Sequence, residues 1–223
     1  ALRSRRMEYG VDYHDLATFH WEHGDREQAL AVAHEGMKKA KGRMDELRAF
    51  LADRARESGD RGGYLDLQFA QATQPLTLAS YKAFRKLCKA EEWPTYEPKM
   101  ETALERAWAG ERLRIHMHRA EYDRAIGILS SMRYPDSRYG DDDLLKIAAQ
   151  LEEKFPEQVL AFYMSGLGRL DQNMQREVYA QKAKIAQKVR HMWLDVIKAP
   201  EKWEALAKQI KTGNLRRPAF QEE

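Results

Sequence analysis

The stretch "HGDREQAL", residues 23–30, decides the fold, because it sets a Gly-Asp corner between two runs rich in apolar residues. The phrase returns loosely as "SGDRGGYL" around Tyr64, as "RAEYDRAI" around Ala125 and as "KFPEQVL" around Val159. Counted from Ala29, the successive spacings are 35, 61 and 34 residues. Periods of about 34 residues, each holding a helix, a tight corner and a second helix, are typical of stacked helical pairs. The longest spacing predicts a further pair between Tyr64 and Ala125.

Helix-forming residues dominate the whole chain. Nowhere do β-branched residues alternate with polar ones over a strand's length, whereas Ala, Leu, Glu, Lys, Arg and Gln are abundant. The sequence therefore predicts an all-α fold, an α-solenoid of stacked antiparallel helix pairs with about twelve helices. The helices are expected near residues 11–22, 26–40, 43–58, 62–73, 77–90, 97–108, 110–119, 121–132, 141–154, 156–170, 173–198 and 200–212.

Glycine and proline mark the expected ends of these helices. Gly24 and Gly59 can adopt the left-handed conformation that closes a helix. Pro94 and Pro135 disfavour helix at the residue before each of them, whereas Pro156 suits a first helical turn. No stretch of low complexity divides the chain, so we expect residues 1–223 to form one domain.

Composition restricts the class of protein. No run of about 18 apolar residues occurs, and the mean hydropathy is −0.75, so no membrane span is predicted. The start "ALRSRRMEYG" has neither an initiator Met nor the apolar stretch of a secretory signal, and we expect Ala1 to be the cut end of a longer protein. Cys88 is the one cysteine, which excludes an internal disulfide framework and favours a reducing, cytoplasmic location.

The first unit resembles a tetratricopeptide repeat. In that family small residues in the middle of both helices let the two backbones approach closely. Two positions depart from the family pattern, because His20 stands where an aromatic is usual and Gly36 where Ala is usual; the closing Pro is also missing. The resemblance implies a degenerate repeat array. The matching small and apolar positions are Leu16, Ala17, Gly24, Ala29 and Ala33.

The second half, about residues 110–223, has a more specific resemblance. The phrases "RIHMHRAEYDRAIGILSSM", "LLKIAAQLEEKFPEQVLAFYMSGL", "YAQKAKIAQKVRHMWL", "WEALAKQI" and "LRRPAFQEE" follow one another in this order. Together they resemble the helical C-terminal region of large bacterial proteins that carry a SWIM zinc finger upstream. That finger needs a Cys-x-Cys pair followed by Cys-x-His, and this chain has one cysteine. The resemblance therefore implies neither metal binding nor nucleic-acid binding here.

Four histidines suggest a metal site at first sight. "HWEH" contains His20 and His23, and "HMH" contains His116 and His118. Helical zinc sites usually pair His residues four apart with a third strong ligand, and these spacings are three and two. His20 and His116 occupy equivalent places in their units, so we expect packing roles with a ring nitrogen satisfied by a neighbour. No metal and no cofactor are predicted.

No catalytic constellation is recognisable. Cys88 lies beside Lys86 and Lys89, which would favour a reactive thiolate, but a buried cysteine on the apolar face with Phe84 and Leu87 is the preferred interpretation. The glycines of "SGLGRL" lack the strand and the Lys-Ser or Lys-Thr of a phosphate-binding loop. We therefore predict a protein that is not an enzyme.

The preferred function is a scaffold that binds a protein or peptide. Arrays of helical pairs expose a long groove on their first helices. Trp21 would be an anchor for a peptide there, or would be wedged between helices, and the sequence leaves both readings open. The residues expected to face the groove are His14, Thr18, Trp21, Asp53 and Arg56.

The alternative function is accessory nucleic-acid binding by the basic C-terminal third. Residues 173–218 contain eleven Lys or Arg against four Asp or Glu. Such a surface would hold phosphates, although a solvated helix face is the commoner meaning. Within 173–198 an apolar stripe is expected at Val178, Ile185, Val189, Met192 and Val196, with the cations Lys182, Lys184, Lys188 and Arg190 on the opposite face.

The end of the chain is expected to cap the array. After a stop at Gly213, Leu215 and Phe220 supply apolar groups that a solvated tail would not need. We expect them to cover the last helix pair, with Arg216 and Arg217 pointing outward.

Overall fold

The computed structural model describes residues 7–135, 142–168 and 176–213. Within these ranges the chain is an all-α helical array of twelve α-helices and one short π-helix, with isolated β-bridges but no strand, as predicted. Its contacts divide it into two compact units, residues 1–107 and 108–223, and each is described by itself. The expectation of a single domain stays a prediction.

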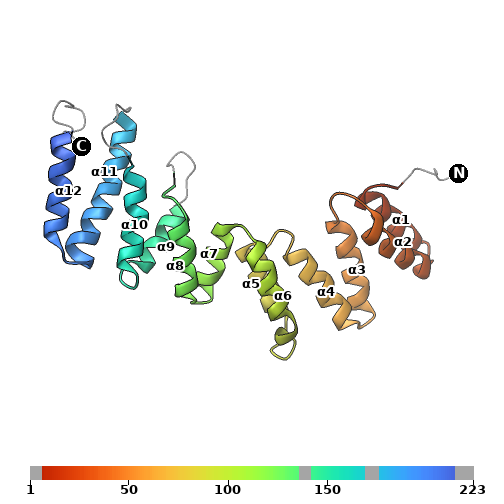
Figure 1. Cartoon of the computed structure of the whole chain (residues 1–223). Helices are drawn as coiled ribbons and strands as arrows, with labels where there is room; N and C mark the ends of the chain where they lie inside the picture. The colour runs from red at the N-terminus through yellow and green to blue at the C-terminus, as the bar shows by residue number, and fades with distance from the viewer. Residues whose placement is uncertain (1–6, 136–141, 169–175, 214–223) are drawn as a thin grey trace. The chain divides into compact units, whose positions relative to one another are not determined.

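The first unit holds six helices. α1 contacts both α2 and α3, α2 contacts α3, and α3 packs on α4, which in turn contacts α5. The helices thus follow one another in chain order within the unit (Figure 1). Their bounds are α1 Gly10–Glu22, α2 Arg26–Lys39, α3 Asp45–Glu57, α4 Arg61–Ala72, α5 Leu78–Leu87 and α6 Trp93–Arg106.

Small residues let α1, α2 and α3 approach closely. Ala17, Ala29 and Ala33 are completely buried, which confirms their predicted packing role. A Cβ atom on Gly36 would lie 2.5 Å from Cβ of Tyr13, so no side chain fits there. The departure from the repeat pattern at Gly36 therefore has a steric cause: an alanine would push α2 away from α1.

Aromatic rings join the last three helices of this unit. The ring centroid of Phe84 on α5 lies 5.4 Å from that of Phe69 on α4 and 5.2 Å from that of Tyr96 on α6. The Tyr96 hydroxyl donates a hydrogen bond to Asp66 at 2.9 Å. Ring contacts of this kind add to the area that the rings bury, so they hold α6 against α4 and α5.

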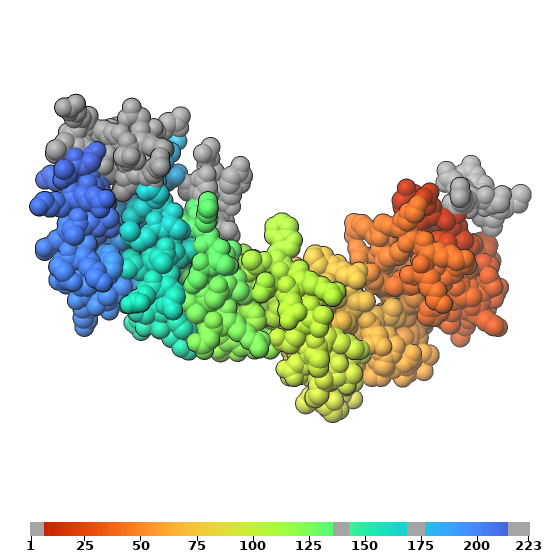
Figure 2. Space-filling view, in the orientation of Figure 1, coloured from red at the N-terminus to blue at the C-terminus, as the bar shows by residue number. Residues whose placement is uncertain are grey.

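The second unit holds the remaining elements. α7 packs on α8 and α9, α8 contacts α9 and α10, and α10 contacts α9, α11 and the π-helix. Figure 2 shows these elements as consecutive bands of colour. Their bounds are α7 Ala109–His118, α8 Tyr122–Ser131, α9 Asp142–Leu151, α10 Pro156–Leu167, α11 Arg176–His191, the π-helix η2 Met192–Val196 and α12 Pro200–Gly213.

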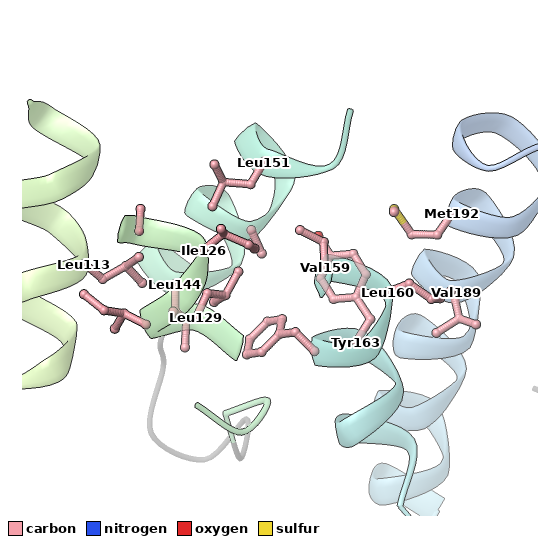
Figure 3. Close-up of a cluster of buried hydrophobic side chains, with 14 of the residues drawn as sticks. Leu113, Ile126, Leu129, Leu144, Leu151, Val159, Leu160, Tyr163, Val189 and Met192 are labelled. Atoms are coloured by element: carbon pink, nitrogen blue, oxygen red, sulfur yellow. The ribbon is translucent and has the colours of Figure 1, made fainter. Parts of the chain in front are cut away.

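Side chains from α7 to η2 form one core in this unit. Tyr163 of α10 is its largest completely buried side chain, and Val189 and Met192 approach from the far side (Figure 3). The predicted stripe is confirmed at Ile185, Val189 and Met192, which are buried, while Val196 packs against the core. Trp193 and Trp203 also pack against this core.

Three corners between helices share one geometry in the described chain. In each, a residue with a left-handed φ precedes the N-cap of the next helix, and the N-cap N–H donates to the carbonyl five residues earlier. This is the hydrogen bond that closes a helix on a left-handed residue. The left-handed residues are Gly24, Gly59 and Ala120, and the N-caps are Asp25, Asp60 and Glu121.

The repeated phrase has the same register in all four copies. Its anchor residue is the fourth after the N-cap, and its N–H makes the first hydrogen bond of the new helix to the N-cap carbonyl. The comparison of the sequence with itself therefore aligned structurally equivalent positions. These anchors are Ala29, Tyr64, Ala125 and Val159.

Two expectations about helix ends were wrong. α6 begins at Trp93, before Pro94, because the first N–H groups of a helix have no partner within it and Pro loses nothing there. Packing supports this start, since the ring of Trp93 lies 6.2 Å from that of Tyr81. The helix expected through 173–198 instead changes to η2 after His191, with an N–H···O bond of 2.8 Å from Ile197 to Met192.

The capping role expected of Leu215 and Phe220, with Arg216 and Arg217 outward, lies outside the described residues. Asp143, at the start of α9, accepts a 3.1 Å hydrogen bond from Nε of Arg114.

Candidate functional site

The predicted partner-binding residues of α1 lie along one side of the helix and face α3. The ring of Trp21 meets Phe50 edge-on with centroids 5.9 Å apart, and His14 meets the same ring at 6.3 Å. Thr18 lies between them in sequence, and its buried hydroxyl has no hydrogen-bond partner among the described residues. The structure therefore brings His14 and Trp21 together on Phe50, a residue that the sequence analysis did not select.

Two guanidinium groups contact the indole of Trp21. The Arg54 guanidinium carbon lies 4.4 Å from the centre of the ring, and that of Arg26 lies 5.3 Å from it. Both distances are within the range of a cation–π interaction. Arg54 is itself held by Glu57 at 3.2 Å. Trp21 on α1 is thus half-buried against side chains of α2 and α3. This agrees with the second interpretation left open by the sequence, that the indole packs between helices.

The two predicted residues of α3 pair with each other. NH2 of Arg56 lies 2.9 Å from Oδ1 of Asp53, and both side chains are about half exposed or more, with exposed fractions of 64% and 48%. We call the surface at which α1 and α3 meet the α1–α3 face. It consists of His14, Thr18 and Trp21 on α1 with Phe50 and Arg54 on α3. Asp53 and Arg56 flank this surface, since Arg56 is six residues from Phe50 and therefore about 120° from it around the helix.

The sequence analysis missed Phe50 and Arg54 of this surface, and Arg26, which contacts Trp21 beside it. Phe50 and Arg54 are four residues apart, the spacing that places two side chains on one face of a helix. That spacing could have shown, from the sequence alone, that Phe50 and Arg54 share one face of α3. The contact of Arg26 with Trp21 depends on the corner between α1 and α2, which no spacing within one helix reveals.

His116 is satisfied by a neighbour, as predicted, whereas the carboxylate beside His20 lies beyond hydrogen-bond distance of its ring. Nδ1 of buried His116 lies 2.7 Å from Oε2 of Glu121, and Nδ1 of His20 lies 3.7 Å from Oδ2 of Asp25. In both cases the carboxylate belongs to the N-cap of the following helix. Among the described side chains, no group of three or more His, Cys, Asp or Glu residues is arranged to hold a metal ion.

Cys88 lies at the end of α5 and is buried, with 6% of its surface exposed. Burial is the main cause that raises the pKa of its thiol. A raised pKa lowers the fraction of reactive thiolate, so the environment agrees with the structural interpretation of this residue.

The predicted cations of α11 do not form one face. Nζ of Lys182 donates to the carbonyl of Leu167, and Nζ of Lys188 lies 5.3 Å from the ring of Tyr163, so both turn toward α10. Burial lowers the pKa of Lys182. Lys184 and Arg190 are exposed, but six residues of helix separate them by about 120° around the axis. The cationic face expected opposite the apolar stripe was therefore wrong, because long lysine side chains reach back to the neighbouring helix.

A polar pocket of about 530 Å³ lies in the second unit and was not predicted. His191 separates two carboxylates there, with Nδ1 2.8 Å from Asp195 and Nε2 3.5 Å from Glu152. Glu152 also accepts a 2.6 Å hydrogen bond from Tyr163, and burial raises the pKa of that phenol. The carboxylates face opposite sides of the imidazole, so they do not converge on one ion.

No helix in the described part of the chain is long and apolar enough to cross a membrane. Comparisons with protein-family models, with curated proteins and with solved structures gave no match.

Proposed function

We propose that this chain is a non-enzymatic helical scaffold that binds a protein or peptide partner on the α1–α3 face. The observation that carries the proposal is the direct packing of α1 on α3, in which the predicted residues His14 and Trp21 both meet Phe50. Half-buried Trp21 gives this surface a rigid aromatic centre, and the exposed pair of Asp53 and Arg56 gives it a charged edge. Aromatic centres with polar rims are the usual composition of protein interfaces.

The charged edge offers a test that preserves the fold. Peptides selected by display against the full chain would be measured again with the double variant Asp53→Arg, Arg56→Asp, which keeps an internal ion pair but exchanges its charges. We expect affinity to fall by about tenfold, equivalent to about 1.4 kcal/mol. The matched control exchanges Glu35 and Lys39, an exposed pair 2.7 Å apart on α2. Equal affinity for both double variants would remove the α1–α3 face from the proposal.

The variant Trp21→Ala tests whether the indole contacts the peptide directly or only packs between helices. Loss of peptide binding at an unchanged melting temperature would identify an anchor, whereas a lower melting temperature is expected if the indole mainly holds Arg26, Arg54 and Phe50. A still-folded variant with unchanged affinity would show that Trp21 is outside the site.

Helical repetition supports a wider proposal about the chain. The common corner geometry and the packing of alternate helices fit a solenoid of tetratricopeptide-like pairs, which the resemblance of the first unit to that repeat implies. The resemblance of the second half to the helical region of SWIM-containing proteins belongs to the same proposal. A cytoplasmic location belongs to the same proposal. Nucleic-acid binding is the weaker alternative, since Lys182 and Lys188 contact α10.

A further inference from the structure

A pocket of about 350 Å³ opens between α3 and α4, apart from the α1–α3 face. Its wall consists mostly of carbon atoms, including those of Leu67 and Ala49. Volumes of this size are typical of pockets that hold small ligands, and an ordered water needs only about 30 Å³. The lining residues are Asp45, Glu46, Arg48, Ala49, Leu67, Gln68 and Gln71.

Arg48 is the unusual member of this lining, because it is 9% exposed and incompletely paired. Its NH2 donates to Oε1 of Gln74 at 2.5 Å, but the nearest carboxylate oxygen, on Asp45, is 3.8 Å from NH1. Nε is buried and has no hydrogen-bond acceptor among the described residues. A buried N–H without an acceptor loses the hydrogen bond that it makes to water in the unfolded chain, so it destabilises the fold.

Gln71 on α4 contributes the complementary group. Its Nε2 donates to Oδ1 of Asp45 at 3.1 Å, while its Oε1 is buried and lacks a donor in the described chain. One unused donor and one unused acceptor, from two helices, therefore belong to residues that line the same pocket. Unsatisfied buried polar atoms are rare in native proteins, and a pair of them beside an empty apolar space indicates a missing partner.

We propose that this pocket binds one apolar residue of an extended peptide. The carbonyl oxygen of the peptide accepts from Nε of Arg48, and its N–H donates to Oε1 of Gln71. Each residue of an extended peptide carries one acceptor and one donor, which matches the two unused groups. The apolar side chain packs against Leu67 and Ala49. Both polar atoms are covered in the free protein, so binding requires side chains around the pocket to move apart.

The lining also selects against other ligands. A free anion would meet the carboxylates of Asp45 and Glu46 at the same pocket. A single water would leave the apolar wall uncovered. This second site lies between α3 and α4 and shares none of the side chains of the α1–α3 face, and it does not rest on the function proposed above.

N-acetyl-leucine methylamide is a suitable probe, because it carries one apolar side chain between two peptide groups. Titrated into the full chain and followed by NMR, it should shift the backbone amide signals of residues 45–49 and 67–71. Gln71→Met removes the acceptor at nearly constant volume and should weaken binding by about tenfold, the effect of one lost hydrogen bond. Ala49→Phe should fill the pocket and abolish the shifts, whereas Ala31→Phe, at an exposed alanine of α2, should not.

Three results would overturn the proposal. The first is the absence of shifts in the two segments, and the second is unchanged affinity in Gln71→Met and Ala49→Phe. The third is an equal response to sodium acetate, which would indicate an anion site at Arg48 instead of a peptide site.

Discussion

Nδ1 of His116 lies 2.7 Å from Oε2 of Glu121, and the two residues bracket the corner between α7 and α8. The carboxylate also contacts Arg119 at 2.7 Å and Arg124 at 3.5 Å, so it joins a buried imidazole to two guanidinium groups. His20 and Asp25 occupy the same places at the first corner, but 3.7 Å apart and more exposed. The same sequence spacing therefore holds a tight contact in one unit and a loose one in the other.

Glu121→Ala should destabilise the second unit. The substitution leaves the buried ring nitrogen of His116 without its partner, which costs about 1–3 kcal/mol. Chemical denaturation followed by circular dichroism measures the change. Lys146→Ala, at an exposed position of α9, serves as the control and should have little effect. A loss no larger than that of the control would show that the contact contributes nothing to stability.

Gly36→Ala should destabilise the first unit by about 1–3 kcal/mol, the usual cost of overpacking. The added methyl group would lie 2.5 Å from Cβ of Tyr13 and 2.8 Å from Cδ2 of Leu47. Gly127→Ala in α8 is the matched control, because a Cβ there has nothing within 4 Å. In the control the better helix propensity of Ala should add about 0.5–1 kcal/mol. Opposite signs of the two changes are the expected result; equal signs would contradict the steric argument.

The left-handed corners predict a reciprocal pair of substitutions. Gly59 has a φ of +79° with open space around its Cα, so Gly59→Ala should cost about 1–2 kcal/mol from backbone conformation alone. Ala120 has a φ of +58°, so Ala120→Gly should relieve the same backbone strain in the folded protein. The gain in stability should be reduced by the greater conformational entropy of glycine in the unfolded chain. Thermal melting of both variants tests this. A lower melting temperature for Ala120→Gly would mean that the two corners are not equivalent.

Glu92 should make the first unit sensitive to acid. Arg61 donates to both of its carboxylate oxygens at 2.8 Å, and the N–H of Lys89 donates to one of them at 2.7 Å. The hydrogen bonds from Arg61 are the largest cause that lowers the pKa of Glu92 from 4.5 to about 2. Because the folded state has the lower pKa, this contribution to stability is complete above pH 4.5 and is lost as the pH falls toward 2.

Glu92→Gln should therefore melt at a lower temperature than the parent at pH 7 and lose less of its melting temperature between pH 4.5 and 2. Glu91→Gln, the exposed neighbour, is the control. An acid dependence of Glu92→Gln as steep as that of the parent would assign the effect to other carboxylates.

Cys88 should react slowly with thiol reagents in the folded protein. It is 6% exposed, and burial raises the pKa of its thiol. Alkylation followed by mass spectrometry should be slow at pH 8 in buffer and rapid in guanidinium chloride, because unfolding exposes the thiol. Equal rates in the two solvents would show that Cys88 is accessible and would reopen its interpretation as a nucleophile.

The sequence determined those features that depend on a few neighbouring residues. Gly24 and Gly59 are left-handed as expected, because only glycine adopts that conformation without strain. Asp25 and Asp60 begin helices because their side chains accept hydrogen bonds from the next free N–H groups. The four anchors of the repeated phrase share one register, because the N–H of each donates to the carbonyl of its N-cap four residues earlier. Such features follow from bond geometry and spacing, which are local.

The tertiary structure alone decided the features that depend on a second helix. Trp21 packs between helices because Arg26 of α2 and Arg54 of α3 both contact its indole. Lys182 and Lys188 turn toward α10, because the carbonyl of Leu167 and the ring of Tyr163 lie within reach of their long side chains. The unused polar atoms of Arg48 and Gln71 belong to two different helices. Helical spacing predicts which side chains share a face of one helix, but contacts between helices are set by packing, which brings together residues far apart in the sequence.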